Sequence, residues 1–151
     1  MVIHQNNKLT GFDIRVLILT FLLIPVLTHD LYAFKFPGLG GKGSEKAQNL
    51  YRNARGAYGS ADYSKAIDLT TKAIKENPKF AKAYALRGKA NKDLGDVDKA
   101  FKDLNRAIEL DSNLGEAYFI RAQTHEIMGD MDKAKADYKK GCKAGYKSAC
   151  N

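Results

Sequence analysis

The sequence predicts an all-α fold built from stacked helical hairpins, and three observations support this. The phrase Asp-x-x-Lys-Ala recurs at a spacing of 34 residues, beginning at Asp62, Asp96 and Asp130. Small residues recur seven positions after the alanine of each phrase, two turns further along the same helix face. No stretch shows the alternation of apolar and polar residues that marks a half-buried strand. This period is typical of a solenoid in which each hairpin covers a face of its neighbour.

Each repeat is expected to contain two helices joined by a tight turn. The turns are Leu-Gly-Asp at 94–96 and Met-Gly-Asp at 128–130. Glycine can adopt the left-handed conformation that ends a helix, and aspartate can cap the helix that follows. Leu104 and Ile108 keep the spacing of an amphipathic helix. Pro78 is expected to end the second helix of the first repeat.

These residues resemble the tetratricopeptide repeat. The first repeat departs from the family pattern at the turn, where Ala61 replaces glycine, and the second repeat departs from it at Arg87 and Asn91. The resemblance implies a right-handed α-α superhelix over residues 47–148, with repeats at 47–80, 81–114 and 115–148. The matching positions are Ala54, Ala66, Ala73 and Pro78 in the first repeat, Tyr84, Gly88, Gly95, Ala100, Leu104 and Ala107 in the second, and Tyr118, Ala122, Gly129, Ala134, Tyr138 and Gly141 in the third.

The N-terminal segment is expected to direct export. Val16 to Leu27 is an apolar run of twelve residues, preceded by Lys8 and Arg15. A membrane-spanning helix needs about 20 apolar residues, so the run is short for an anchor and favours a signal peptide over residues 1–33. The alternative is an uncleaved anchor that contacts the membrane through residues 14–27. A Gly-rich flexible linker is expected at 34–46.

The two cysteines, Cys142 and Cys150, both lie at the C-terminal edge of the chain. An exported chain meets oxidising conditions, so the two are expected to pair. Such a disulfide would hold the C-terminal end, residues 149–151, against the last repeat. The spacing also resembles that of cysteine-rich bacterial helical-repeat proteins, in which each pair joins one hairpin. A redox-active thiol pair is the alternative, but Cys-x-x-Cys spacing is absent.

The formal net charge of +8 favours acidic partners in general terms. The excess is spread over the linker and all three repeats. Much of it alternates with aspartate and glutamate, as in residues 96–106, which is the pattern of an ordinary solvated helix face.

The resemblance also implies a binding groove, because in tetratricopeptide arrays the first helices of successive repeats line a concave surface that holds peptides. Tyr51, Arg55 and Tyr58 are the preferred contact residues, since tyrosine and arginine combine large area with directional hydrogen bonds. The full predicted groove, by register, is Gln48, Tyr51, Arg55 and Tyr58, then Lys82, Ala85, Lys89 and Lys92, then Glu116, Phe119, Gln123 and Glu126.

One tetratricopeptide subfamily clamps the C-terminal carboxylate of heat-shock chaperones with lysine, arginine and asparagine side chains. The resemblance places Tyr51, Arg55, Leu86, Glu116 and Ile120 at those positions, so the clamp and its function are not expected.

No enzyme, cofactor or metal is predicted. The chain lacks glycine-rich phosphate loops, nucleophile elbows and a second histidine or cysteine at metal-ligand spacing near His125. His125 is instead expected to pack between helices.

The sequence therefore favours a non-enzymatic adaptor, periplasmic or secreted, that binds a peptide segment of an envelope protein. Two alternatives remain open. The chain could bind an anionic envelope polymer, or nucleic acid if it is cytosolic, although nucleic acid is the less favoured ligand. It could also be a structural spacer that stacks on copies of itself.

Overall fold

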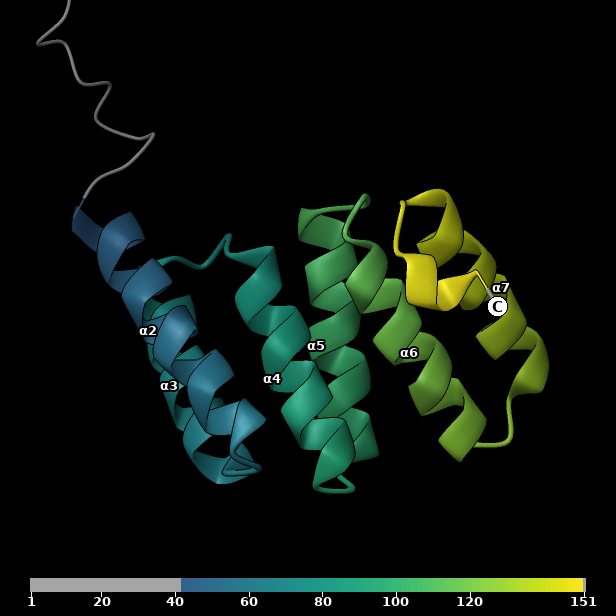
Figure 1. Cartoon of the computed structure of the whole chain (residues 1–151), viewed down its shortest axis with the longest axis horizontal. Coiled ribbons are helices and arrows are strands. Elements are labelled where there is room, and N and C mark those ends of the chain that lie inside the picture. The colour runs from purple at the N-terminus through teal and green to yellow at the C-terminus, as the bar shows by residue number, and fades with distance from the viewer. Residues whose placement is uncertain (1–41, 151) are drawn as a thin grey trace, which may run out of the picture. The chain divides into compact units, whose positions relative to one another are not determined.

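The computed structural model describes residues 42–150 (Figure 1). The predicted signal peptide or anchor, and the predicted linker as far as residue 41, lie outside the described residues. Within the described part no strand occurs, and none of its helices has the length and apolar character needed to cross a bilayer. The helices are α2 (Lys42–Gly59), α3 (Tyr63–Glu76), α4 (Ala81–Asp93), α5 (Val97–Leu110), α6 (Gly115–Ile127), α7 (Met131–Lys143) and the short 3-10 helix η1 (Lys147–Ala149).

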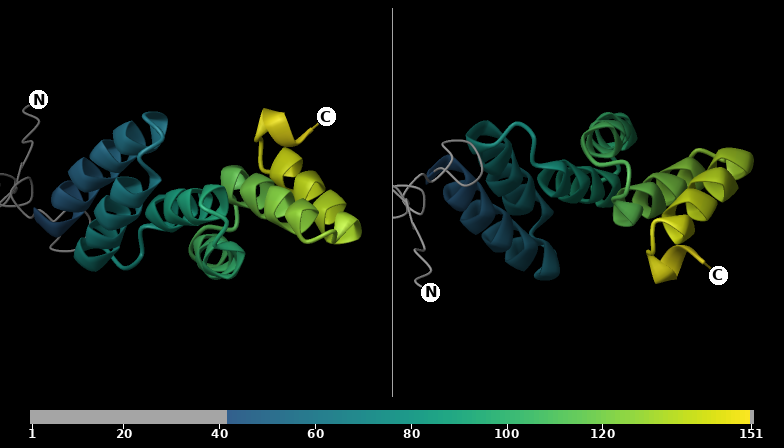
Figure 2. Two further views of the ribbon diagram at one scale, coloured as in Figure 1. Left: turned by 90° about the horizontal axis from the view of Figure 1, so that it is seen from below. Right: turned by 90° about the horizontal axis from the view of Figure 1, so that it is seen from above.

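The helices form three antiparallel hairpins, α2–α3, α4–α5 and α6–α7. The hairpins stack through contacts of α3 with α4 and of α5 with α6. Figure 2 shows them following one another along the unit, from blue to yellow. The prediction of an all-α solenoid of helical hairpins is confirmed.

The helix boundaries agree with the predicted repeats except at the first. Helices α4 and α6 begin at Ala81 and Gly115, which are the predicted repeat starts. Helix α2 begins at Lys42, so the last five residues of the predicted linker, 42–46, are helical. The glycine-rich composition ends at Gly43, and Glu45 in the first turn favours the helix through the positive end of its dipole.

Small residues at the helix contacts allow the two helices of a hairpin to approach closely. Ala66 on α3 and Ala100 on α5 are completely buried, as is Leu104, which faces Gly88. A Cβ atom at Gly88 would lie 2.9 Å from Cγ of Leu104 and 3.2 Å from the carbonyl oxygen of Ala100. Because real Cβ atoms do not approach this closely, α4 and α5 can pack at their observed separation only with glycine at this position.

The turn between the helices of a hairpin has the same backbone hydrogen bonds in all three hairpins. At the end of α2, the Asp62 amide donates to the carbonyl of Ala57, and the Ala61 amide donates to the carbonyl of Tyr58. This is the Schellman pattern, in which the residue after the helix is left-handed. Gly95 occupies that place after α4 with φ 84°, and Ala61 occupies it after α2 with φ 59°. Ala61 therefore carries backbone strain that glycine avoids.

The three repeated aspartates do not all act as predicted. All stand at the N-cap position, but only Asp62 accepts a bond from a helix amide, that of Lys65 at 3.1 Å. The Asp96 and Asp130 carboxylates instead each pair with a lysine ammonium three residues on, Lys99 and Lys133, at 2.8 Å. The prediction that the side chains of these two aspartates cap the next helix is wrong, because their carboxylates bind the lysine ammonium groups and no helix amide.

A buried arginine fork joins each later hairpin to the one before it. Nε and Nη2 of Arg87 donate to the two Asp103 oxygens at 2.8 and 2.7 Å, within the second hairpin. Nη1 of Arg87 donates to Oγ1 of Thr71 on α3, in the first hairpin, at 3.1 Å. The third hairpin repeats the arrangement with Arg121, which binds Asp137 and reaches back to Asn105 on α5. The fork therefore fixes the stacking of successive hairpins as well as the pairing within one.

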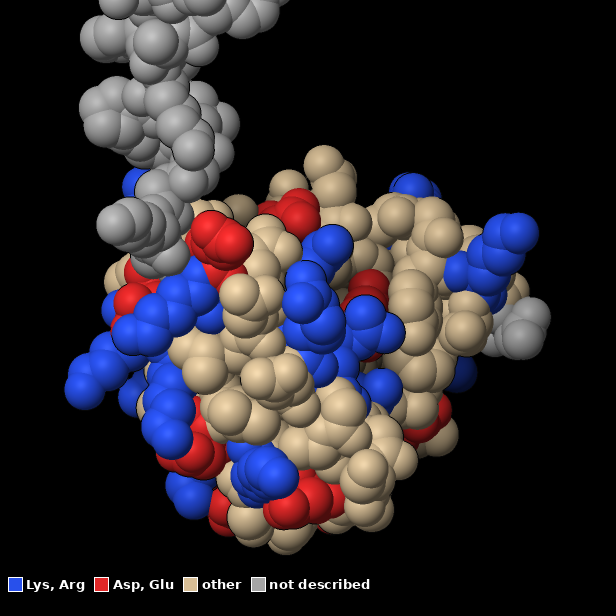
Figure 3. Space-filling model, turned by 60° about the vertical axis from the view of Figure 1, so that its left-hand side comes forward, with Lys and Arg blue, Asp and Glu red and all other residues tan. Residues whose placement is uncertain are grey.

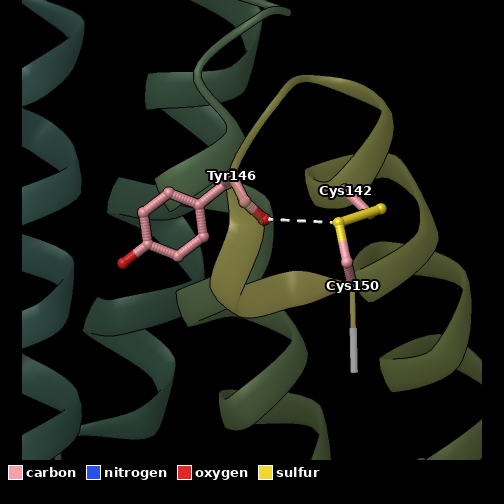
Figure 4. Close-up of a disulfide and its surroundings, with 3 residues drawn as sticks. All are labelled: Cys142, Tyr146 and Cys150. Carbon is pink, nitrogen blue, oxygen red and sulfur yellow. Dashed lines mark hydrogen bonds between the residues drawn. A yellow bond between two sulfur atoms is a disulfide. The ribbon is translucent and has the colours of Figure 1, made fainter.

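The C-terminal end is closed by η1 and by a disulfide between Cys142 and Cys150, whose Cα atoms lie 4.8 Å apart (Figure 4). The predicted pairing is therefore present. Sγ of Cys150 lies 3.9 Å from the carbonyl oxygen of Tyr146, while the Tyr146 ring points away from the sulfur atoms. Ala149 is buried against Gly141, where an added Cβ would lie 3.0 Å from that of Ala149.

We expect Ala61→Gly to stabilise the protein by up to about 1 kcal/mol, because relief of left-handed strain exceeds the entropy that glycine adds to the unfolded chain. Thermal unfolding followed by circular dichroism measures the change. Gly95→Ala is the matched control and should lower stability by a similar amount. A lower melting temperature for Ala61→Gly would contradict the left-handed assignment.

We expect Asp103→Ala to destabilise the protein by about 3 kcal/mol, because it leaves the mostly buried guanidinium of Arg87 without its carboxylate. Asp68→Ala removes an exposed ion pair with Lys72 and should cost less than about 1 kcal/mol. Urea unfolding of both variants provides the comparison. Equal losses would show that the fork contributes no more than a surface pair.

Candidate functional site

The first helices of the three hairpins line the inner side of the solenoid. Helix α4 contacts both α2 and α6, whereas α3, α5 and α7 make no contact with one another in the described part of the chain. The hairpins therefore lie closer together on the side of their first helices than on the side of their second helices. Such a stack is curved, and its concave side is that of the first helices. The faces of α2, α4 and α6 that point away from the second helices therefore form the concave face, as the resemblance implied.

The structure exposes most, but not all, of the predicted groove residues. Ala85 is the exception, since only 1 % of it is exposed and it belongs to the core cluster around Leu104. Ala85 is therefore not a contact residue, because it packs in the core among residues of α5 and α6. The exposed members are Gln48, Arg55, Lys82 and Glu126, and the half-buried members are Tyr51, Tyr58, Lys89, Lys92, Glu116, Phe119 and Gln123.

At the N-terminal end of the groove, an aromatic pair borders a shallow depression. The rings of Tyr51 and Phe80 lie 5.0 Å apart and tilted. Burial raises the pKa of the Tyr51 phenol, the Glu116 carboxylate raises it further, and Arg55 opposes the shift. Glu116 on α6 thus acts across the groove on a side chain of α2. The depression is lined by Gln48, Tyr51, Lys79, Phe80, Ala81, Lys82, Leu110 and Asp111.

A polar ladder crosses the middle of the groove from α2 to α6. The Tyr58 hydroxyl donates to Asp93 at the end of α4. Lys92 pairs with the same carboxylate at 2.9 Å and donates to Oε1 of Gln123 at 3.3 Å. Burial is the main cause that raises the pKa of Tyr58, and its bond to Asp93 adds to the shift. The polar groups of three predicted groove residues, Tyr58, Lys92 and Gln123, are therefore bound within the groove, and the Lys92 side chain is mostly buried.

At the C-terminal end, Phe119 lies between the rings of Tyr138 and Tyr146, with centroid distances of 5.6 and 5.2 Å. The Tyr138 hydroxyl donates to Oε2 of Glu126 at 2.9 Å. Burial and this bond raise the pKa of Tyr138 to about 12. The predicted residues Phe119 and Glu126 are thus held by α7 and the turn into η1.

Sequence reasoning missed four residues of this face, namely Phe80, Asp93, Tyr138 and Tyr146. Phe80 and Tyr146 lie in connecting segments, to which a helical register does not extend. Asp93 is the last residue of α4, and its carboxylate binds both Tyr58 and Lys92. The signal that could have identified Asp93 is its separation of 35 residues from Tyr58, one more than the repeat period.

The groove is left with positive charge at its N-terminal half. Among the described residues, no carboxylate lies within ion-pair distance of Arg55, Lys82 or Lys89. The Lys89 ammonium lies 4.7 Å above the Tyr58 ring, a cation–π contact that leaves its charge available. Figure 3 shows lysine and arginine side chains scattered over one face of the molecule, with acidic side chains among them.

His125 packs between helices, as expected. Its ring lies 4.6 Å from that of Phe101, and Nδ1 is buried without a hydrogen-bond partner in the described region. Burial is the main cause that lowers the pKa of His125, while the Asp137 carboxylate opposes the shift. No group of three or more potential metal ligands occurs among residues 42–150.

The fold and its inner face define a helical-repeat solenoid with a concave side. Residues 81–114 and 115–144 each match the tetratricopeptide repeat family, so these two segments have the character of tetratricopeptide repeats in tandem. The predicted fold class, a right-handed α-α superhelix, is confirmed by these matches and by the solved structures that the chain resembles. This family is a protein-interaction scaffold. Comparison with curated proteins gave no match.

Three solved structures illustrate the likeness. The tetratricopeptide domain of Arabidopsis OM64 is 26 % identical, with a TM-score of 0.63 over 66 % of this chain and 82 % of that one. The first such domain of Spaghetti (RPAP3), bound to the HSP90 peptide SRMEEVD, is 26 % identical, with a TM-score of 0.64 over 67 % and 80 %. The TPR2B domain of yeast Sti1, in complex with an Hsp70 peptide, is 26 % identical, with a TM-score of 0.64 over 67 % and 81 %.

We expect protein stability to fall as the pH rises from 10 to about 12. The folded pKa of Tyr138 is raised above its ordinary value of 10.0, so its contribution is complete below pH 10 and is lost as the phenol ionises. Ring NMR of labelled tyrosine measures the titration. Glu126→Gln should move the Tyr138 pKa back toward 10.0, and an unchanged titration would contradict the bond.

Proposed function

We propose that the chain is a non-enzymatic adaptor that binds a peptide segment of a partner protein along its concave face. The observation that supports this best is the N-terminal half of the groove. Tyr51 is half-buried there and offers a large contact area. Three cations lie in the same half of the groove without a carboxylate at ion-pair distance among the described residues, namely Arg55, Lys82 and Lys89. Tyrosine and arginine are the residues in which binding energy most often concentrates.

The first hairpin, α2–α3, is in this proposal a third, diverged tetratricopeptide repeat. Its turn has the same hydrogen bonds as the other two, with Ala61 in the glycine position. It lacks the internal arginine fork, because Asn53 and Leu69 stand where Arg87 and Asp103 stand in the next repeat. In the described part of the chain, no hairpin precedes α2–α3 for such a fork to hold.

The peptide bound differs from the chaperone tails named for the structural neighbours. Of the five positions that a chaperone clamp would use, Leu86 and Ile120 are 8 % and 1 % exposed and apolar. A third position holds Glu116, which repels a carboxylate. The groove therefore selects a segment that places its negative charge near Arg55 and Lys89.

The setting we propose is the cell envelope. The apolar run from Val16 to Leu27, with basic residues before it, supports export, and the disulfide between Cys142 and Cys150 fits an oxidising compartment. The partner would then be a periplasmic or secreted protein, or a membrane protein if residues 14–27 remain as an anchor.

We expect a photocrosslinking probe at Tyr51 to capture a partner in cells, and a probe at Lys72, on the outer helix α3, to capture none. Arg55→Glu with Lys89→Glu should abolish the capture from Tyr51. The control pair, Lys65→Glu with Lys75→Glu, changes the net charge equally and should preserve it. Equal capture from both probes, or capture that survives the groove variant, would contradict the assignment.

A further inference from the structure

Most of the positive charge of the third repeat lies on α7 and η1. Residues 131–150 contain six lysines and two aspartates, a net charge of +4, whereas the repeat as a whole carries +2. The acidic residues of the repeat lie mostly on α6 and in the turn, so the hairpin separates its charges. The exposed lysines of this segment are Lys133, Lys135, Lys139, Lys140, Lys143 and Lys147.

Helix α7 has two carboxylates, Asp132 and Asp137. Asp132 is exposed and lies three residues before Lys135, but it makes no ion pair in the described region. Asp137 is 3 % exposed and is bound by the fork of Arg121 at 2.7 and 2.8 Å. Lys133 alone is paired, with Asp130 at 2.8 Å. No other exposed lysine of α7 or η1 lies within ion-pair distance of a carboxylate in the described region.

The outer helices of the other hairpins differ. On α3, Lys72 pairs with Asp68 at 2.7 Å, and on α5, Arg106 pairs with Glu109 at 3.0 Å. Helices α3 and α5 also have exposed lysines without an ion pair among the described residues, namely Lys65, Lys75 and Lys102, so α7 differs in having more of them at regular spacing. Lysines four residues apart without intervening acids repel each other and destabilise a helix slightly.

The unpaired lysines are arranged in a line. Lys135, Lys139 and Lys143 follow one another at intervals of four residues on the side of α7 opposite the buried Ala134 and Gly141. One such interval advances about 6 Å along a helix. Lys147 is also exposed, on η1, which the disulfide holds to the end of α7.

We infer that this lysine face, defined by Lys135, Lys139, Lys143 and Lys147, binds a linear anionic polymer. A polymer that carries a negative charge on every unit can neutralise successive lysines and release its own counterions, which drives such binding. The face has no apolar side chain between these lysines that could insert into a bilayer, since Ala136 is the only apolar residue among the exposed ones from Asp132 to Lys143. The surface is distinct from the concave groove, so both ligands can be bound together.

Binding of long-chain polyphosphate to the full chain, measured by fluorescence anisotropy over a series of salt concentrations, tests this inference. The triple variant Lys135→Gln, Lys139→Gln and Lys143→Gln should weaken binding at least about tenfold and reduce the salt slope by about two. The matched control is Lys65→Gln, Lys72→Gln and Lys75→Gln on α3, which removes equal charge and should change the affinity less than about twofold.

Three outcomes would overturn the inference. These are equal weakening by the two triple variants, no binding by the unaltered chain, and a preference for anionic phospholipid vesicles over polyphosphate. Circular dichroism of each variant verifies that the helices are retained. The groove variant with Arg55→Glu and Lys89→Glu should bind polyphosphate nearly as well as the unaltered chain, so the two sites can fail independently.

Discussion

The buried arginine fork is the interaction on which the rest of the structure depends. Arg87 binds Asp103 within its own hairpin and Thr71 on the hairpin before it, and Arg121 repeats the arrangement. A planar guanidinium can satisfy a carboxylate with two bonds and still donate sideways, which an ammonium group cannot do with fixed geometry. One residue type therefore joins the two helices within the second and the third hairpin and also holds each of these hairpins to the one before it.

The fork also determines where charge remains at the surface. Because Asp103 and Asp137 are buried with their arginines, the outer faces of α5 and α7 lose an acidic residue each. Helix α5 retains Glu109 beside Arg106, whereas α7 has no acidic residue after Asp137. The same stacking brings α2, α4 and α6 into contact and so forms the concave face. The two surfaces proposed to bind ligands thus arise from one packing arrangement.

The features predicted correctly from the sequence are those that recur with the period or that join residues close in the chain. The starts of α4 and α6 and the left-handed glycines of the turns recur with the period, and Cys142 and Cys150 are eight residues apart. The inaccurate predictions depended on which of several partners a side chain binds, or on packing between helices. The Asp96 and Asp130 carboxylates bind lysine ammonium groups and not helix amides. Ala85 is buried because it packs among residues of α5 and α6.

The candidate site was predictable as a face but not as a set of contacts. Register alone placed Tyr58 and Lys92 on the inner face. It did not show that Asp93 joins them, because that bond depends on how α2 and α4 stack rather than on spacing within one helix. Consequently the sequence did not show that Lys92 is neutralised by Asp93. The cations of the inner face without an ion pair among the described residues are Arg55, Lys82 and Lys89.

The most direct test of the concave face as the binding surface uses a peptide selected for binding to the unaltered protein from a random display library. Amide chemical-shift changes on addition of that peptide show where it binds, whatever the natural partner is. If the concave face is the binding surface, the changes will concentrate on α2, α4 and α6, around Tyr51, Lys82 and Lys89. Changes concentrated on α3, α5 or α7 would contradict it.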